Sequence, residues 1–239
     1  MAARQPTPAE AVLSLPAAED APGPALALFD LDRTLLRGSS LIALGHALVD
    51  EGLVRRRTLA GAALLNARYR RRGASDADAQ RVRSRALQSV TGLERSVLRD
   101  IVDRVGPALA ADVAPGARLL LDHHRRSGDF CVVLSASPQE LVESICAALG
   151  GHRGIGTRAA VDGDLLTGEL DGPFCYGSGK LARLRDALGP VDLVGAWAYA
   201  DSRSDLPLLE ACGNPVAVNP DRALRRIAAT KRWPVVRVA

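Results

Sequence analysis

Hydrophobic and polar positions change their spacing along the chain. Ala25–Phe29 is a short apolar run that ends at Asp30, a pattern typical of a buried strand. From about Ser39 to Ala111 the apolar positions recur at helical spacing, and glycines separate the segments. The pattern therefore predicts one strand followed by an inserted group of helices. The predicted helical segments lie near Leu41–Val49, Leu59–Tyr69, Ala77–Val90 and Glu94–Val105.

After this insert, strand and helix patterns alternate. Pro115 and Gly116 begin a predicted helix that Gly128 ends. Thr157–Val161 and Leu165–Leu170 flank an Asp-Gly-Asp turn and predict a hairpin. Alternation of this kind predicts a Rossmann-like α/β fold, a mostly parallel sheet with helices on both faces. The other predicted elements are the strands Phe130–Leu134, Ala196–Ala200, Val216–Val218 and Val235–Val238, and the helices Gln139–Leu149, Ser178–Leu188, Ser204–Ala211 and Arg222–Thr230.

These patterns divide the chain into three predicted parts. Residues 1–24 are rich in Ala and Pro and are predicted to be a mobile N-terminal tail. They have neither the basic start nor the apolar stretch of a signal peptide. Residues 25–38 and 112–239 form the predicted catalytic core, and residues 39–111 form a helical cap inserted after the first strand.

Composition narrows the class of protein. The 239 residues are 47% hydrophobic and 24% charged, as in soluble proteins that form a core. Apolar runs are broken well before the roughly 20 residues that a membrane span needs. The four cysteines lie far apart and form no C-x-x-C pair, so no disulfide framework or zinc site is predicted. This usage fits a reducing compartment, and we predict a cytoplasmic location.

The net charge of +4 raises the question of a nucleic-acid partner. Much of the excess lies in arginine runs between Arg55 and Arg85, which are typical of solvated helix faces, and few aromatic residues are available to stack on bases. We therefore expect no nucleic acid and favour an anionic small-molecule substrate. An arginine-rich cap that docks on RNA or anionic lipid is a weaker alternative, which salt-sensitive binding would support. The oligomeric state is not predicted.

Polar residues follow the predicted strands where a parallel sheet binds its ligands, at the carboxyl ends. Asp30 and Asp32 follow the first strand, so that one carboxylate can attack phosphorus while the other handles the proton of the leaving group. Ser135 follows the next strand and offers a hydroxyl and neighbouring backbone N–H groups to phosphoryl oxygens. Ser137 to Glu140 has capping-box spacing, and a helix starting there would turn its positive end toward Ser135.

Two later segments complete the predicted site. Asp201 and Asp205 supply hard carboxylate oxygens, which suit Mg²⁺. Lys180 begins a predicted helix and is one of only two lysines, which suggests that a compact charge is needed there. Each pattern alone is common, and Gly177 to Lys180 lacks the upstream glycine spacing of a P-loop. Their occurrence in this order is much harder to attribute to chance.

Four segments, FDLDRTL, VVLSASP, GSGK and YADSRSDLPLLE, resemble in chain order the four motifs of the haloacid dehalogenase (HAD) superfamily. The resemblance covers Ala25 to Val238, and the helical insert is similar to the cap of the phosphoserine-phosphatase-like branch, subclass IB. It implies a Mg²⁺-dependent phosphomonoester hydrolase. In that role Asp30 is the nucleophile that forms an aspartyl-phosphate, and Asp32 is the general acid/base.

The same resemblance implies the other roles by position. It assigns the metal to Asp30, the backbone carbonyl of Asp32, Asp201 and Asp205, the phosphoryl group to Ser135, Ala136 and Lys180, and the support of the first loop to Thr34. The implied substrate is a small-molecule phosphomonoester.

Two positions depart from the family pattern. Arg33 stands where Gly or Ser is frequent, although it lies between the motif residues and need not disturb them. Ser39 stands where phosphoserine phosphatases usually carry a glutamate for the substrate ammonium, and the nearest acids are Asp50 and Glu51. A dedicated phosphoserine phosphatase is therefore an alternative rather than the main prediction. A catalytically retired HAD domain that serves as a binding module is another, which the intact carboxylate set argues against.

Overall fold

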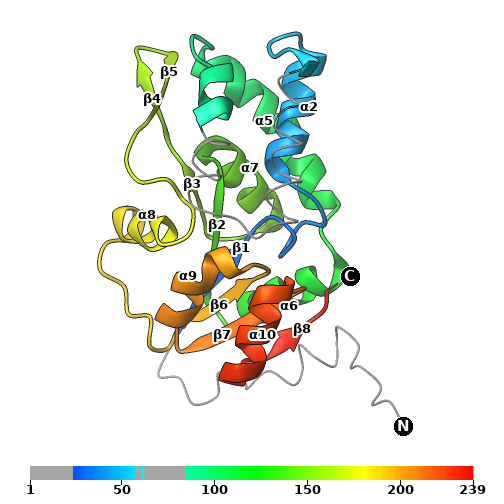
Figure 1. Ribbon diagram of the computed structural model, residues 1–239, viewed down its shortest axis with the longest axis vertical. Helices are drawn as coiled ribbons and strands as arrows, with labels where there is room; N and C mark the ends of the chain where they lie inside the picture. Colours follow the sequence, from blue (N-terminus) through cyan, green and yellow to red (C-terminus); the bar gives the residue numbers. More distant parts are fainter. Residues whose placement is uncertain (1–23, 58–60, 62–83, 239) are drawn as a thin grey trace.

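A computed structural model describes residues 24–57, 61 and 84–238 (Figure 1). Its main sheet has six strands in the order β3-β2-β1-β6-β7-β8, and every neighbouring pair is parallel. This order confirms the predicted Rossmann-like α/β fold and places β1 in the middle of the sheet. The strands are β1 (Leu26–Asp30), β2 (Phe130–Pro138), β3 (Arg153–Thr157), β6 (Trp197–Ala200), β7 (Asn214–Val218) and β8 (Val235–Val236).

Alternate residues of each buried strand point to opposite faces of the sheet, so both faces are apolar. Helices cover both of them. Ala27 and Phe29 of β1 belong to one core cluster, whereas Leu28 belongs to the other. The first cluster includes residues of α6 (Pro115–Arg126) and α7 (Gln139–Leu149). The second includes residues of α8 (Gly179–Leu188), α9 (Leu206–Ala211) and α10 (Arg222–Lys231). A short 3₁₀ helix, η2 (Arg203–Asp205), precedes α9.

The register of the central strands brings their polar ends to one edge. Asp30 pairs with Leu134, so Ser135 lies one residue beyond that level on β2. Phe29 pairs with Tyr199, which places Ala200 level with Asp30 and Asp201 just beyond it. The apolar residues next to this level, Ala27–Phe29 of β1, Val132–Leu134 of β2 and Ala198–Ala200 of β6, are fully buried. The candidate catalytic residues therefore lie at the carboxyl ends of the strands, directly after their buried apolar residues.

The sequence analysis missed the strand beside β2, because β3 covers Arg153–Thr157 in the main sheet. The predicted hairpin is confirmed, since β4 (Ala159–Asp162) and β5 (Leu165–Leu170) pair antiparallel, and its first strand begins two residues later than predicted. β3 was not recognised in the sequence because Gly154 and Gly156 interrupt the apolar run that is typical of a buried strand. An added Cβ would lie 2.7 Å from the carbonyl oxygen of Val142 in α7 at Gly154, and 2.7 Å from that of Ser137 in β2 at Gly156, so close packing requires glycine at both positions.

The predicted capping box is also absent. β2 extends to Pro138, which is the N-cap of α7, and no side chain caps that helix. The hydroxyl of Ser137 instead lies 2.7 Å from that of Ser40. Gln139 is turned toward β3, where its Oε1 accepts from the N–H of Gly156 at 2.8 Å. Ser137 is therefore used to tie β2 to the insert rather than to begin a helix.

The described helices of the insert include α2 (Ser40–Asp50) and α5 (Arg95–Ala111), which lie beyond the carboxyl edge of the sheet (Figure 1). Residues 84–89 are helical as well. α5 packs so closely on α7 that a side chain at Gly106 would collide with Ser144, whose hydroxyl donates to the carbonyl of Val102. The predicted segment Leu59–Tyr69, much of Ala77–Val90 and the predicted tail lie outside the described residues. The division into core and cap stays a prediction.

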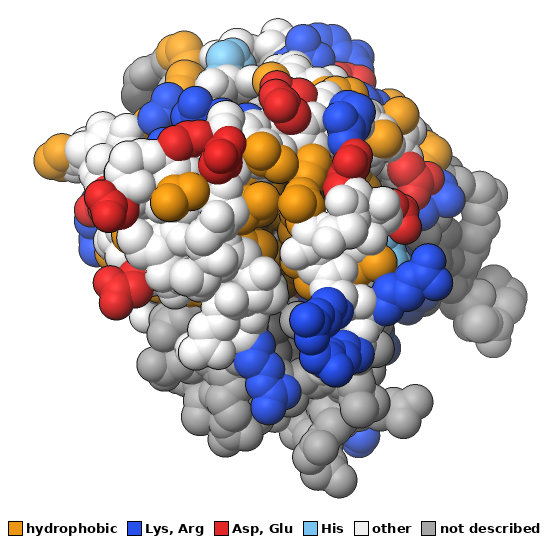
Figure 2. All heavy atoms as spheres, turned by 90° about the horizontal axis from the view of Figure 1, so that it is seen from above, with side chains coloured by type: hydrophobic (Ala, Val, Ile, Leu, Met, Phe, Trp, Pro, Cys, Tyr) orange, Lys and Arg blue, Asp and Glu red, His pale blue; other side chains and the backbone are white. Residues whose placement is uncertain are grey.

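The surface above this edge carries both signs of charge. Figure 2 shows acidic and basic side chains around a central group of apolar ones on the face seen from above. Among the described helices, none has the length and apolar character that a membrane crossing requires. All four cysteines are buried and free, and Cys131 and Cys146 belong to the first core cluster.

Candidate active site

Three carboxylates and one ammonium group meet at the carboxyl edge of the sheet. Asp30 ends β1, Asp201 follows β6 and Asp205 ends η2, and one oxygen from each lies within 4.8 Å of the others. Lys180, in the first turn of α8, places Nζ 2.5 Å from Asp30 Oδ1 and 2.6 Å from Asp205 Oδ1. All four residues are buried. The structure thus brings together four residues that the sequence analysis selected from three separate motifs.

The two aspartates of the first motif have different partners. Thr34 Oγ1 donates to Asp30 Oδ2 at 2.7 Å, so both oxygens of Asp30 are held, one by Thr34 and one by Lys180. Asp32 turns toward the insert, where the N–H of Ser40 donates to its Oδ1 at 2.7 Å. Asp32 is therefore attached to the first residue of α2.

Burial changes the acidity of these groups. Loss of solvent raises the pKa of Asp32 to about 6, against the opposing hydrogen bonds from Ser40. Burial and the charge of Asp30 raise the pKa of Asp201 to about 8, and burial raises that of Asp205 to about 6 despite Lys180. Burial lowers the pKa of Lys180, but the carboxylates of Asp205 and Asp30 have a larger effect and hold this pKa above its usual value.

This donor set fits a hard divalent cation. Three buried carboxylates lie within ligand distance of one another, and burial together with their mutual repulsion makes Asp201 and Asp205 resist ionisation. A cation with oxygen ligands, such as Mg²⁺, would remove that repulsion.

Ser135 and Ala136 lie beside this cluster at the end of β2. Ser135 is buried, and its hydroxyl accepts from the N–H of Ser137 at 3.2 Å. The carbonyl of Ala136 accepts from Thr157 Oγ1 at 2.8 Å, which fixes the segment to β3. Ser135 thus lies at the same edge as Asp30 on the neighbouring strand, as the sequence predicted.

Arg33 contacts the site, which the sequence analysis did not anticipate. Its Nε lies 3.1 Å from Asp201 Oδ2. Its backbone is left-handed, with φ of 66°, and its carbonyl accepts from Asn219 Nδ2 at 3.2 Å. The departure from Gly or Ser at this position was the only sign in the sequence.

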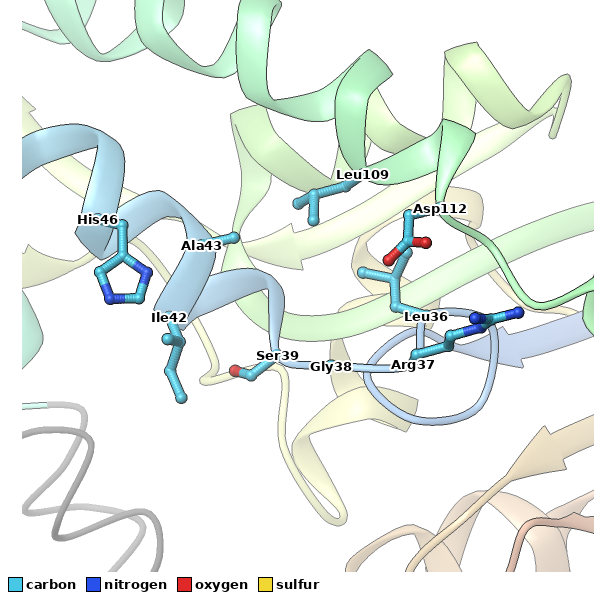
Figure 3. A pocket seen from close by; sticks show the side chains of 9 residues that line it. All are labelled: Leu36, Arg37, Gly38, Ser39, Ile42, Ala43, His46, Leu109 and Asp112. Carbon is cyan, nitrogen blue, oxygen red and sulfur yellow. The ribbon is translucent and has the colours of Figure 1, made fainter. Parts of the chain in front are cut away.

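A cavity of about 200 Å³ adjoins the start of α2 (Figure 3). Ser39 lines it, and the one carboxylate among its lining residues belongs to Asp112. Asp50 is exposed at the far end of α2, and Glu51 forms an ion pair with Arg104. Asp112 was missed because it is 73 positions from Ser39 in the sequence and joins the cavity only through the fold. The nine lining residues are Leu36, Arg37, Gly38, Ser39, Ile42, Ala43, His46, Leu109 and Asp112.

Known proteins resemble this chain over most of its length. The family model for haloacid dehalogenase-like hydrolases matches residues 27–210. A probable phosphatase of Mycobacterium tuberculosis is 35% identical over 217 residues, which span 88% of this chain and 74% of the relative. A phosphoserine phosphatase of the same organism is 32% identical, with 88% and 70% covered. A histidinol-phosphatase of Neisseria meningitidis is 30% identical, with 88% and 97% covered.

Solved structures share the fold. A Bordetella pertussis protein of unknown function has a TM-score of 0.78 and 26% identity, covering 90% of this chain and 99% of that one. A substrate-bound phosphoserine phosphatase has a TM-score of 0.60 and 17% identity, covering 90% and 93%. With the family match and the phosphatase relatives, these similarities show that the chain belongs to the haloacid dehalogenase-like hydrolases and is a phosphatase of the phosphoserine-phosphatase-like branch.

Proposed function

We propose that this phosphatase hydrolyses a small-molecule phosphomonoester through an aspartyl-phosphate on Asp30, with Asp32 as general acid/base and Mg²⁺ as cofactor. The supporting observation is the unequal environment of the two aspartates. Asp30 is held through both oxygens by Lys180 and Thr34, whereas Asp32 is bound by Ser40 and has a pKa of about 6. Two neighbouring carboxyl groups in different environments are typical of a nucleophile beside an acid/base.

The reaction takes two steps. A carboxylate oxygen of Asp30 forms a bond to phosphorus, the bond from phosphorus to the leaving oxygen breaks, and Asp32 gives that oxygen its proton. Asp32, now a carboxylate, then takes a proton from water as the water oxygen bonds to phosphorus. The bond from phosphorus to Asp30 breaks, which releases phosphate and restores both aspartates.

Other residues of the site would bind and orient the phosphoryl group. Lys180 offers a buried positive charge, and Ser135 and Ala136 offer a hydroxyl and backbone N–H groups at the end of β2. Thr34 would hold Asp30 in position. Asp30, Asp201 and Asp205, with the backbone carbonyl of Asp32, would hold Mg²⁺, which neutralises charge on the phosphoryl group when bound.

The substrate is proposed by class. Relatives named phosphoserine phosphatase and histidinol-phosphatase make L-phosphoserine and histidinol phosphate candidates. Ser39 lacks the acid that the phosphoserine phosphatases use, but Asp112 lines the same cavity, which keeps a dedicated phosphoserine phosphatase as a second candidate. A cytoplasmic location, a helical cap at residues 39–111 and the lack of a nucleic-acid partner are parts of the same proposal.

A panel of phosphomonoesters tests this function. The wild-type protein with Mg²⁺ should release inorganic phosphate from at least one of them, and Asp30→Asn should release none. Asp122→Asn is the matched control, because Asp122 lies on α6 and its carboxylate pairs with Arg125, away from the site. Equal rates for the wild type and Asp30→Asn would show that the nucleophile is elsewhere. No release by the wild type from any ester would favour the retired binding module.

A further inference from the structure

Arg33 occupies an unusual place beside the proposed metal ligands. Its side chain is 35% exposed, whereas that of its partner Asp201 is only 6% exposed. The guanidinium therefore approaches the buried carboxylate from the solvent side of the site. A left-handed backbone favours glycine, so the conformation at Arg33 does not by itself explain why an arginine stands there.

Each carboxylate of the proposed metal site has a cationic partner within the chain. Lys180 contacts both Asp30 and Asp205, and Arg33 contacts Asp201. The two cations differ in freedom, because the Lys180 side chain is only 3% exposed. Lys180 is enclosed between its two carboxylates, while Arg33 can turn into solvent by rotating its side chain.

The backbone of Arg33 is held in place while its side chain is not. The amide nitrogen of Asn219 donates to the Arg33 carbonyl, and the amide oxygen of the same Asn219 accepts from the N–H of Val238. This bridge ties the loop after β1 to the C-terminal segment. Exchange of the guanidinium for another cation at Asp201 therefore needs no movement of the loop.

We propose that Arg33 is a built-in counter-cation that competes with the divalent metal for Asp201 and so lowers the affinity of the site for metal. The inference rests on the proposed function, because it takes Asp201 as a metal ligand. In the metal-free protein Arg33 neutralises Asp201. When a divalent cation binds the three carboxylates, the guanidinium is repelled and turns toward the mouth of the site. Metal occupancy then depends on an internal competitor as well as on the ligands.

Mg²⁺ binding without substrate tests the proposal, measured by isothermal titration calorimetry after EDTA treatment and dialysis. Arg33→Gln removes the charge and keeps a long polar side chain, and we expect it to bind Mg²⁺ about tenfold more tightly than the wild type, since one nearby charge is removed at a partly exposed position. Arg33→Lys keeps the charge and should stay within about threefold of the wild type. Arg37→Gln is the matched control, because it makes the same charge change at an exposed position in the same loop and should leave the affinity unchanged.

The outcomes separate the two levels of the proposal. Wild-type binding with equal or weaker binding by Arg33→Gln would overturn the role of Arg33 and leave the metal site intact. Failure of the wild type to bind millimolar Mg²⁺ would overturn the proposed metal site and this inference together. Should Arg33→Gln fail to fold, Arg33→Gly removes the same charge and suits the left-handed backbone, and the same gain in affinity is expected from it.

Discussion

Lys180 Nζ lies 2.5 Å from Asp30 Oδ1, although 150 positions separate the two residues in the chain. The contact joins the start of α8 to the end of β1, so it depends on the packing of the whole core between them. Asp205 shares the same ammonium group at 2.6 Å. The three residues form one buried charged unit, in which removal of Lys180 leaves both carboxylates without their cation.

Lys180→Met should therefore destabilise the protein as well as abolish activity. Two buried carboxylates would lose their cation, and such a loss costs about 3–5 kcal/mol in the free energy of unfolding. Urea denaturation measured by circular dichroism checks this. Lys231→Met is the control, because Lys231 pairs with Glu210 at the surface and its loss should cost less than about 1 kcal/mol. Equal stability of the two variants would contradict the buried unit.

Asp30→Asn and Asp32→Asn should fail at different points. Asp30→Asn should form no phosphoenzyme, because an amide is a poor nucleophile. Asp32→Asn should still become phosphorylated by an ester with a good leaving group, but with turnover lowered by about 10²–10⁴-fold. Reductive labelling followed by mass spectrometry locates the phosphorylated residue. Label on Asp32 in the wild type would reverse the two roles.

Removal of metal should stop the reaction. The proposed ligands are hard carboxylate oxygens close to one another, a set that suits Mg²⁺ better than the larger Ca²⁺ when the geometry must stay octahedral. We expect no turnover after treatment with EDTA and dialysis, recovery with Mg²⁺, and little recovery with Ca²⁺. Phosphate release measured across these three conditions checks this. Full turnover in excess EDTA would rule out the metal.

The stability of the metal-free protein should fall as pH rises. Asp32, Asp201 and Asp205 have raised pKa values of about 6, 8 and 6, so the folded state holds more protons than the unfolded state between about pH 4 and 8. The free energy of unfolding is therefore highest at the acidic end of this range. It falls as the pH rises to about 6, where Asp32 and Asp205 ionise in the folded state, and falls further up to about 8, where Asp201 ionises. The melting temperature in EDTA should drop by several degrees from pH 5 to pH 8.

Mg²⁺ and Asp201→Asn provide the two controls for this pH effect. Bound metal compensates the ionised carboxylates, so the drop in melting temperature should shrink in saturating Mg²⁺. Asp201→Asn removes the group with the highest of these pKa values and should flatten the drop above pH 6 in EDTA. A drop of the same size under all three conditions would assign it to groups outside the site.

Local apolar patterns were sufficient to predict most of the fold. The polar residues at the strand ends were sufficient to predict which residues meet at the candidate site. β1 was found because an apolar run stops at Asp30, and the register of its neighbours then placed Ser135 and Asp201 at the same edge. β3 was missed because it packs closely against α7, which requires glycines at Gly154 and Gly156 and removes the hydrophobic pattern of a buried strand.

The contacts of Arg33 and Asp112 were not predictable for a different reason. Arg33 reaches Asp201 from the loop after β1, and Asp112 joins the Ser39 cavity from the far end of α5. Such contacts depend on side-chain direction and helix packing, which spacing along the chain does not determine. The positions of the motif residues at strand ends could be predicted, because the order of the strands in the sheet determines where those ends lie.

L-Phosphoserine should be a poorly selected substrate. In the proposed function the four motifs contact only the phosphoryl group, so selectivity would come from residues near the leaving group. A closed site that prefers free phosphoserine needs an acid for its ammonium. Ser39 supplies none, Asp50 is exposed and Glu51 is paired with Arg104. The measurement is kcat/KM for L-phosphoserine against a panel that includes histidinol phosphate. A preference for L-phosphoserine above about a hundredfold, roughly 3 kcal/mol, would contradict this prediction, and its loss in Asp112→Asn would then identify Asp112 as the acid that replaces the missing glutamate.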